Sequence, residues 1–172
     1  MYTRHEVRKF AMQILYMIDQ NEMAIAENKL SQLRLAREAA REEKRVFVES
    51  EVIYKDEVER LTLASAVAQV FDNFEKSDDA ISLANYATLN SEKIDEVINA
   101  SLTNYKLDRL NSVDRAILRL ATSELMAKNT PAEVVINEAL ELTRTSMAMA
   151  TPSAVWTTHC LISYVVMSST LV

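Results

Sequence analysis

The chain has 172 residues, contains no glycine and only two prolines, and carries a net charge of −6. This length suffices for one domain with a sizeable core. The lack of glycine excludes the glycine-rich loops of nucleotide enzymes and the nucleophile elbow of hydrolases. Because helices need no glycine while tight strand turns mostly do, the composition predicts an all-α fold.

The first expected element is an amphipathic helix over residues 3–20, with apolar positions at helical spacing on one face. Arg4 and Arg8 lie one turn apart on another face, with Lys9 beside them. A short basic end on an acidic body can contact a few phosphates, and each contact adds salt-sensitive affinity. A solvated helix start is the alternative.

A second, highly charged helix is expected over residues 28–50, where the apolar stripe is thin. From Lys29 to Arg60 there are eight bases and eight acids, a balance that favours a solvated arm over RNA contact. An interaction arm is the alternative, although nothing in the sequence names its partner. The pattern over residues 55–75 has a broad apolar face and predicts a core helix.

Residues 77–91 follow a weaker pattern that begins near Asp78-Asp79. These carboxylates lack the other ligands and the central glycine of a calcium loop, so they are interpreted as a helix cap, and no metal is expected. Another helix is expected over residues 91–104.

Two consecutive helices are expected between Asn104 and Arg144, joined by the turn Lys128-Asn129-Thr130. The second helix opens on Thr130-Pro131-Ala132-Glu133, which has the pattern of a capping box. The Asp-Arg pairs in this stretch are interpreted as helix caps and ion pairs, so no catalytic residue is predicted.

Several irregular polar positions here also carry a family resemblance. The runs LDRL, VDRAILRLA-x-x-EL and P-x-x-VVINEA-x-EL resemble the carboxy-terminal half of the NusB family, bacterial transcription antitermination factors. Tyr105 stands where that family often has tryptophan. The run R-x-x-x-R-K-x-A-x-Q-x-L-Y, from Arg4 to Tyr16, is similar to the arginine-rich start of the family, although fewer arginines are present.

This resemblance implies a single all-α domain over residues 1–172, built as a NusB-like helical bundle of two packed subdomains. Its amino-terminal helices would cover about 3–75, its carboxy-terminal helices about 91–144, and an atypical uncharged tail 145–172. It implies a cytoplasmic protein that is no enzyme, has no cofactor and spans no membrane. It would bind boxA-type RNA together with NusE, a ribosomal small-subunit protein, on the RNA polymerase elongation complex, and so promote ribosomal RNA transcription.

The family's RNA site lies at the basic end and near the turn that precedes the last conserved helices. The residues that the resemblance assigns to RNA binding are Arg4, Arg8, Lys9, Lys128 and Asn129. Two alternatives stay open: a recognition module related to those of ribosomal RNA methyltransferases, and a helical protein-interaction scaffold with weakened RNA binding.

The tail from Thr145 to Val172 contains no Asp, Glu, Lys or Arg. The glycine-containing turn and last helix of the family are missing from it. When the codons are read one base out of frame, the permitted string includes D-G-D-G-N-A-K-R-x-V-D-N-A-L, which resembles that ending. Our hypothesis is a frameshift in or near the codons for Thr145 and Ser146, and a genuinely divergent tail is the alternative.

Overall fold

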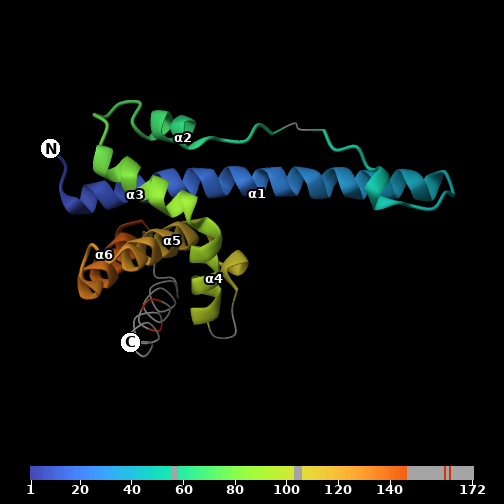
Figure 1. The fold of residues 1–172 in the computed structure, drawn as a ribbon. Coiled ribbons are helices and arrows are strands. Elements are labelled where there is room, and N and C mark those ends of the chain that lie inside the picture. The colour runs from blue at the N-terminus through green and yellow to red at the C-terminus, as the bar shows by residue number, and fades with distance from the viewer. Residues whose placement is uncertain (56–57, 103–105, 147–160, 162, 164–172) are drawn as a thin grey trace.

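The structure is a computed structural model that describes residues 1–55, 58–102, 106–146, 161 and 163 (Figure 1). Every regular element in these ranges is a helix, which confirms the predicted all-α fold. The α-helices are α1 (Arg4–Glu42), α2 (Leu63–Val70), α3 (Asp78–Leu89), α4 (Ser91–Ser101), α5 (Ser112–Ala127) and α6 (Ala132–Ser146), with 3₁₀ turns η1 (Glu49–Glu51) and η2 (Leu107–Arg109). None of the described helices combines the length and the apolar character needed to cross a bilayer.

Helix α1 is a single helix of 39 residues, so the prediction of separate helices over 3–20 and 28–50 is wrong. The intervening residues include neither glycine nor proline and are mostly good helix formers, so nothing local ends the first helix. The helix ends at Glu42, and two residues later Lys44 takes a left-handed conformation with φ of 54°. In place of a second long helix, the chain therefore has one helix that is twice as long as expected.

The helix predicted over residues 55–75, by contrast, is shorter than expected: only α2 is helical. Thr62 caps it, because the hydroxyl of Thr62 accepts a hydrogen bond from the backbone N–H of Ser65 at 3.2 Å. A cap at this position satisfies an N–H group that has no partner within the helix. The described residues that precede Thr62 form a chain that runs back alongside α1 (Figure 1).

Two amide side chains of α1 hold this returning chain. Gln32 donates from Nε2 to the carbonyl of Lys55 and accepts at Oε1 from the Lys55 N–H, both at 2.7 Å. Asn21 makes the same kind of clamp, donating to the carbonyl of Glu59 at 2.9 Å and accepting from the Leu61 N–H at 2.7 Å. These bonds satisfy backbone N–H and C=O groups of the returning chain, which has no helical hydrogen bonds of its own at these positions.

The core lies where the first half of α1 meets α3 and α5, and α5 in turn packs against α4 and α6. Its buried apolar residues come from both halves of the chain and form one cluster. The largest fully buried aliphatic side chains include Ile14, Ile94, Ile98, Ile117, Leu118 and Leu120. Each contributes roughly 1.5–3 kcal/mol relative to an exposed position. The described tail residue Leu161 is buried in the same cluster.

An ion-pair network joins α1 to α5 at the edge of this core, with Asp19 and Arg115 buried and Arg119 and Asp95 partly exposed. The Asp19 carboxylate lies 2.6 Å from Nη2 of Arg115 and 2.6 Å from Nη1 of Arg119, and Arg119 also pairs with Asp95 at 2.8 Å. Burial by itself would lower the pKa of Arg119, but its hydrogen bonds and charge interactions with Asp95 and Asp19 outweigh burial and raise that pKa. The interpretation of Arg115 as an ion-pairing residue is therefore correct, although its partner lies far away in the sequence.

The remaining helices begin and end close to where the pattern puts them. Helix α3 starts at Asp78, and its cap is Ser77, so the prediction of a cap at Asp78-Asp79 is wrong: these two carboxylates lie in the first turn. At the start of α6 the N–H groups of Val134 and Val135 donate to the carbonyl of Pro131, and the hydrogen bonds of the described residues include no capping box between Thr130 and Glu133. Tyr105 and the tail beyond Ser146, apart from residues 161 and 163, lie outside the described residues.

Candidate nucleic-acid interface

The first turn of α1 is fixed by a capping box formed by Thr3 and Glu6. The Glu6 carboxylate accepts from the backbone N–H of Thr3 at 2.7 Å and from its hydroxyl at 2.8 Å, while the Thr3 hydroxyl accepts from the Glu6 N–H at 3.2 Å. The backbone hydrogen bond from Thr3, followed by the side-chain bond, lowers the pKa of Glu6. Arg4 lies inside this rigid turn and is exposed to solvent.

Arg8, one turn further on, is buried and only 5% exposed. Its guanidinium makes a two-pronged pair with the Glu124 carboxylate, from Nε at 2.9 Å and from Nη2 at 2.8 Å, and lies 4.0 Å from Glu138. Burial would lower the pKa of Arg8, but the hydrogen bonds and charge of Glu124 and the charge of Glu138 raise it overall. Arg8 therefore stays charged, and it ties α1 to α5 and α6.

The turn between α5 and α6 supplies the other predicted residues. Lys128 ends α5 in a left-handed conformation with φ of 55°, and its N–H donates to the carbonyls of Glu124 and Leu125. A left-handed residue reverses the chain direction, a position that glycine usually fills. Both Lys128 and Asn129 are exposed at this turn.

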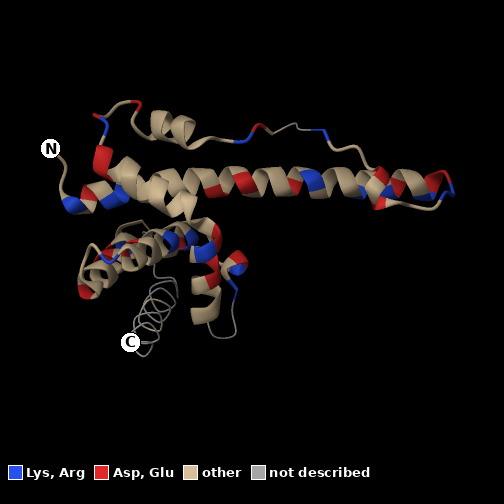
Figure 2. Cartoon of the chain, viewed as in Figure 1, with Lys and Arg blue, Asp and Glu red and all other residues tan. Residues whose placement is uncertain are grey.

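A groove with a volume of about 630 Å³ joins these two regions. Three of the five predicted residues, Arg4, Arg8 and Asn129, are among its lining residues, although Asn129 is more than a hundred positions from the other two. Lys9 and Lys128 are exposed but are not among the lining residues. Figure 2 shows basic and acidic residues close together at this end of α1.

Helix α3 contributes an aromatic side chain that the sequence analysis did not select. Tyr86 lines the groove and is 38% exposed, so part of its side chain is accessible to solvent. A tyrosine ring is a group on which unstacked bases stack. Tyr2 also lines the groove, but its ring packs edge-on against Phe10 with centroids 5.0 Å apart, and its hydroxyl donates to the carbonyl of Glu75 at 2.8 Å. The weak pattern over residues 77–91 gave no signal that Tyr86 would face the basic end.

The chemistry of the groove is that of binding rather than catalysis or metal coordination. It offers an exposed guanidinium, an exposed amide and an aromatic face, which suit phosphates, base edges and base faces respectively. The carboxylates of Asp79 and Glu124 also line it, and Glu124 is neutralised by Arg8. Among the described residues no group of three or more metal-ligating side chains is gathered.

The structure is that of an all-helical protein with a groove at the start of its first helix. The sequence model of the NusB family matches residues 46–153, more than half of the chain. The chain belongs to the NusB family. The match begins after α1, so the similarity of residues 4–16 to the basic start of the family stays a prediction.

Individual relatives agree with this membership. The chain is 36% identical over 97 residues to transcription antitermination protein NusB of Anaeromyxobacter dehalogenans strain 2CP-1, covering 54% of this chain and 68% of the relative. It is 35% identical over 96 residues to the protein of the same name from Bacillus subtilis strain 168, covering 55% and 72%. These relatives are named as antitermination proteins, which are not enzymes, in agreement with the prediction from the sequence.

Proposed function

We propose that this chain is an RNA-binding transcription antitermination factor that binds boxA-type RNA together with NusE and promotes ribosomal RNA transcription. Membership of the NusB family and the printed names of its relatives support this proposal. The observation that carries the RNA site is the groove in which Arg4 and Asn129, distant in sequence, lie together with an exposed tyrosine.

The exposed groups of the groove have complementary tasks. Arg4 and the nearby Lys9 attract the phosphate backbone, which supplies salt-dependent affinity without reading sequence. The amide of Asn129 can donate to and accept from the edge of a base, and the ring of Tyr86 provides a face for stacking. Arg8 acts through position: its pair with Glu124 fixes the start of α1 beside the turn.

The partners follow from the same proposal. NusE docks on a helical surface of the protein, and the pair holds boxA-type RNA on the elongating RNA polymerase in the cytoplasm. Two binding components that share one RNA raise each other's effective concentration, so modest contacts by each can give firm joint binding. This fits a chain whose exposed basic end is short.

The test is a titration of labelled boxA-type RNA, with and without NusE, at two salt concentrations. The test variant is Arg4→Ala/Lys9→Ala, which removes exposed charges and leaves the buried Arg8 intact. The matched control is Lys29→Ala/Lys93→Ala, which removes two exposed bases from other parts of the chain. We expect the test variant to weaken binding and to lower the salt slope by about one unit per lost phosphate contact.

A third variant separates stacking from charge. Tyr86→Leu keeps the apolar bulk and removes the aromatic face, and we expect a loss of roughly 1–3 kcal/mol in RNA affinity with an unchanged salt slope. If the folded protein binds no boxA-type RNA with NusE present, or if test and control variants bind equally well, the RNA site is wrong. The scaffold alternative is then preferred.

A further inference from the structure

The second half of α1 and the chain that returns from it form a protruding arm, defined here as residues 23–55. Figure 1 shows that this arm extends well past the other helices. From Met23 to Glu42 the helix spans about 30 Å at 1.5 Å per residue. Of the thirteen large hydrophobic side chains that are exposed in the described residues, seven lie on the arm: Met23, Leu30, Leu35, Val46, Val48, Ile53 and Tyr54.

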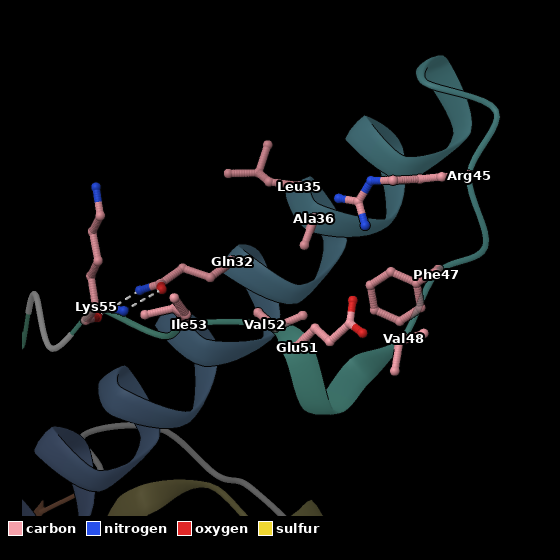
Figure 3. Close-up of a pocket in the computed structure, with 10 residues that line it drawn as sticks. All are labelled: Gln32, Leu35, Ala36, Arg45, Phe47, Val48, Glu51, Val52, Ile53 and Lys55. Atoms are coloured by element: carbon pink, nitrogen blue, oxygen red, sulfur yellow. Dashed lines mark hydrogen bonds between the residues drawn. The ribbon is translucent and has the colours of Figure 1, made fainter.

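The arm is held together as a unit. Besides the Gln32 clamp on Lys55, Arg37 lies over the ring of Phe47 at 5.1 Å and pairs with Glu49 at 3.6 Å. Figure 3 shows the residues that line a cavity between α1 and the returning chain. The cavity has a volume of about 460 Å³, and half of its lining residues are aliphatic. These contacts fix the returning chain on one face of the second half of α1. The opposite face of this helix is not covered by the returning chain.

That other face has the spacing of a helix-pairing seam. Met23, Ala26, Leu30 and Leu33 follow one another at intervals of three and four residues, as in the a and d positions of a heptad. The exposed Glu27 and Arg34 lie one heptad apart along one edge of this seam. Two such helices in antiparallel order, centred between Leu30 and Leu33, bring Glu27 of each copy next to Arg34 of the other.

The charge distribution favours a second copy of this chain at the arm. Residues 23–55 hold seven bases and six acids, so the arm is close to neutral and the rest of the molecule carries the acidic excess. Two acidic copies repel each other, and that repulsion is smallest where the local net charge is zero. Pairing through the arms also keeps the acidic remainders of the two copies apart, because each arm helix is about 30 Å long.

The body offers a place for the end of the partner's arm. A concave corner of about 1080 Å³ lies between the seam and the body, lined by Met23, Ala26 and Leu30 on one side and by Asn99 and Leu107 among others on the body side. Its charged lining residues include Lys106 and the ion-paired Asp19, Asp95, Arg115 and Arg119, besides the carboxylates of Glu22 and Asp108. An antiparallel partner brings Arg41 and Lys44 of its arm tip to this corner, where these carboxylates attract them.

We propose that two copies of this chain associate through their arms as an antiparallel, two-fold symmetric helix pair, with each arm tip seated in the corner of the other copy. The same surface of both copies meets itself, so every contact occurs twice. The Glu27 and Arg34 contacts then make the association specific, since a shift in register or a parallel order separates them. This inference is independent of RNA binding.

The test measures the mass of the full chain by sedimentation equilibrium over a range of concentrations. We expect a concentration-dependent dimer that Leu30→Glu weakens at least tenfold, because each introduced carboxylate would lie opposite Leu33 of the other copy in an apolar seam. The matched control is Leu89→Glu, an exposed leucine on α3 that is outside the arm. Circular dichroism confirms that each variant is folded.

A charge exchange tests the symmetry. Glu27→Arg and Arg34→Glu each weaken the dimer several-fold, because each creates two like-charge contacts. The double variant Glu27→Arg/Arg34→Glu restores it, because opposite charges face each other again in the two-fold arrangement. A folded chain that stays monomeric at every concentration, a dimer unaffected by Leu30→Glu, or a double variant no better than the single ones overturns the proposal.

Discussion

Arg8 and Arg4 show how differently two arginines one turn apart can be used. Arg4 is exposed at the mouth of the groove, whereas Arg8 is buried in a paired contact with Glu124. Spacing on a helix face suggested the same task for both side chains. Their environments give them different roles. A buried charge needs a partner of opposite charge, and a guanidinium that is neutralised in this way attracts a phosphate only weakly.

Removing Arg8 should therefore affect stability before it affects RNA. We expect Arg8→Ala to lower the free energy of unfolding by about 3 kcal/mol, because the carboxylate of Glu124 is left buried without its partner. Arg4→Ala, the matched exposed change, should lie within about 0.5 kcal/mol of the parent chain. Urea denaturation followed by circular dichroism measures both values.

A second variant separates the lost pair from lost packing. In Arg8→Met/Glu124→Leu both charges are replaced by apolar groups of similar size, and most of the lost stability should return. If Arg8→Ala is as mild as Arg4→Ala, the buried pair does not form in solution. Arg8 would then be free to act as an RNA contact.

The continuity of α1 is the main difference between expected and observed elements. The sequence analysis divided residues 3–50 into two helices because the apolar stripe thins after residue 20. A thin stripe shows that one side of the helix is solvated, but it does not end the helix. Only a capping or breaking residue ends it, and the first such position is at Lys44.

A proline placed in the middle of α1 tests this continuity. Ala24 is exposed and lies between the two helices that were predicted over residues 3–20 and 28–50. If the helix is continuous, Ala24→Pro removes a backbone hydrogen bond and costs roughly 3 kcal/mol locally. Amide hydrogen exchange in the arm should then accelerate strongly, while the amides of α5 keep their protection.

Ala24→Ser is the control, because it changes the side chain and keeps the backbone N–H. Equal exchange in the proline and serine variants would mean that residues 20–28 are a linker. That result would contradict the protruding arm and, with it, the proposed dimer.

Across the whole molecule, the family resemblance and the uncharged tail contradict each other. The family match ends at residue 153, a few positions after the last charged residue, Arg144. Asp, Glu, Lys and Arg are common in most protein segments, and there are none between Thr145 and Val172. The frameshift hypothesis explains both observations by one event, and it stays a prediction.

Sequencing the coding DNA around the codons for Thr145 and Ser146 tests it. We expect an insertion or deletion there, and a restored frame that encodes a glycine-containing turn and a charged last helix. A chain with the restored ending should be more soluble, because charged residues replace a stretch that has none. An uninterrupted frame with no family-like alternative would establish the tail as genuine.

The sequence by itself determined the helical class, the family and the approximate bounds of α3 to α6. These follow from composition and from contacts three or four residues apart, which are local and can be read along the chain. It also indicated Arg4 and Asn129, through resemblance, as members of one site.

Only the tertiary structure decided which side chains those residues meet. The pairing of Arg8 with Glu124 and of Asp19 with Arg115, and the presence of Tyr86 in the groove, join positions far apart in the sequence. No local pattern encodes such contacts, because they depend on how whole helices pack against one another. For the same reason the sequence did not predict the arm. It exists because the other helices pack only against the first half of α1.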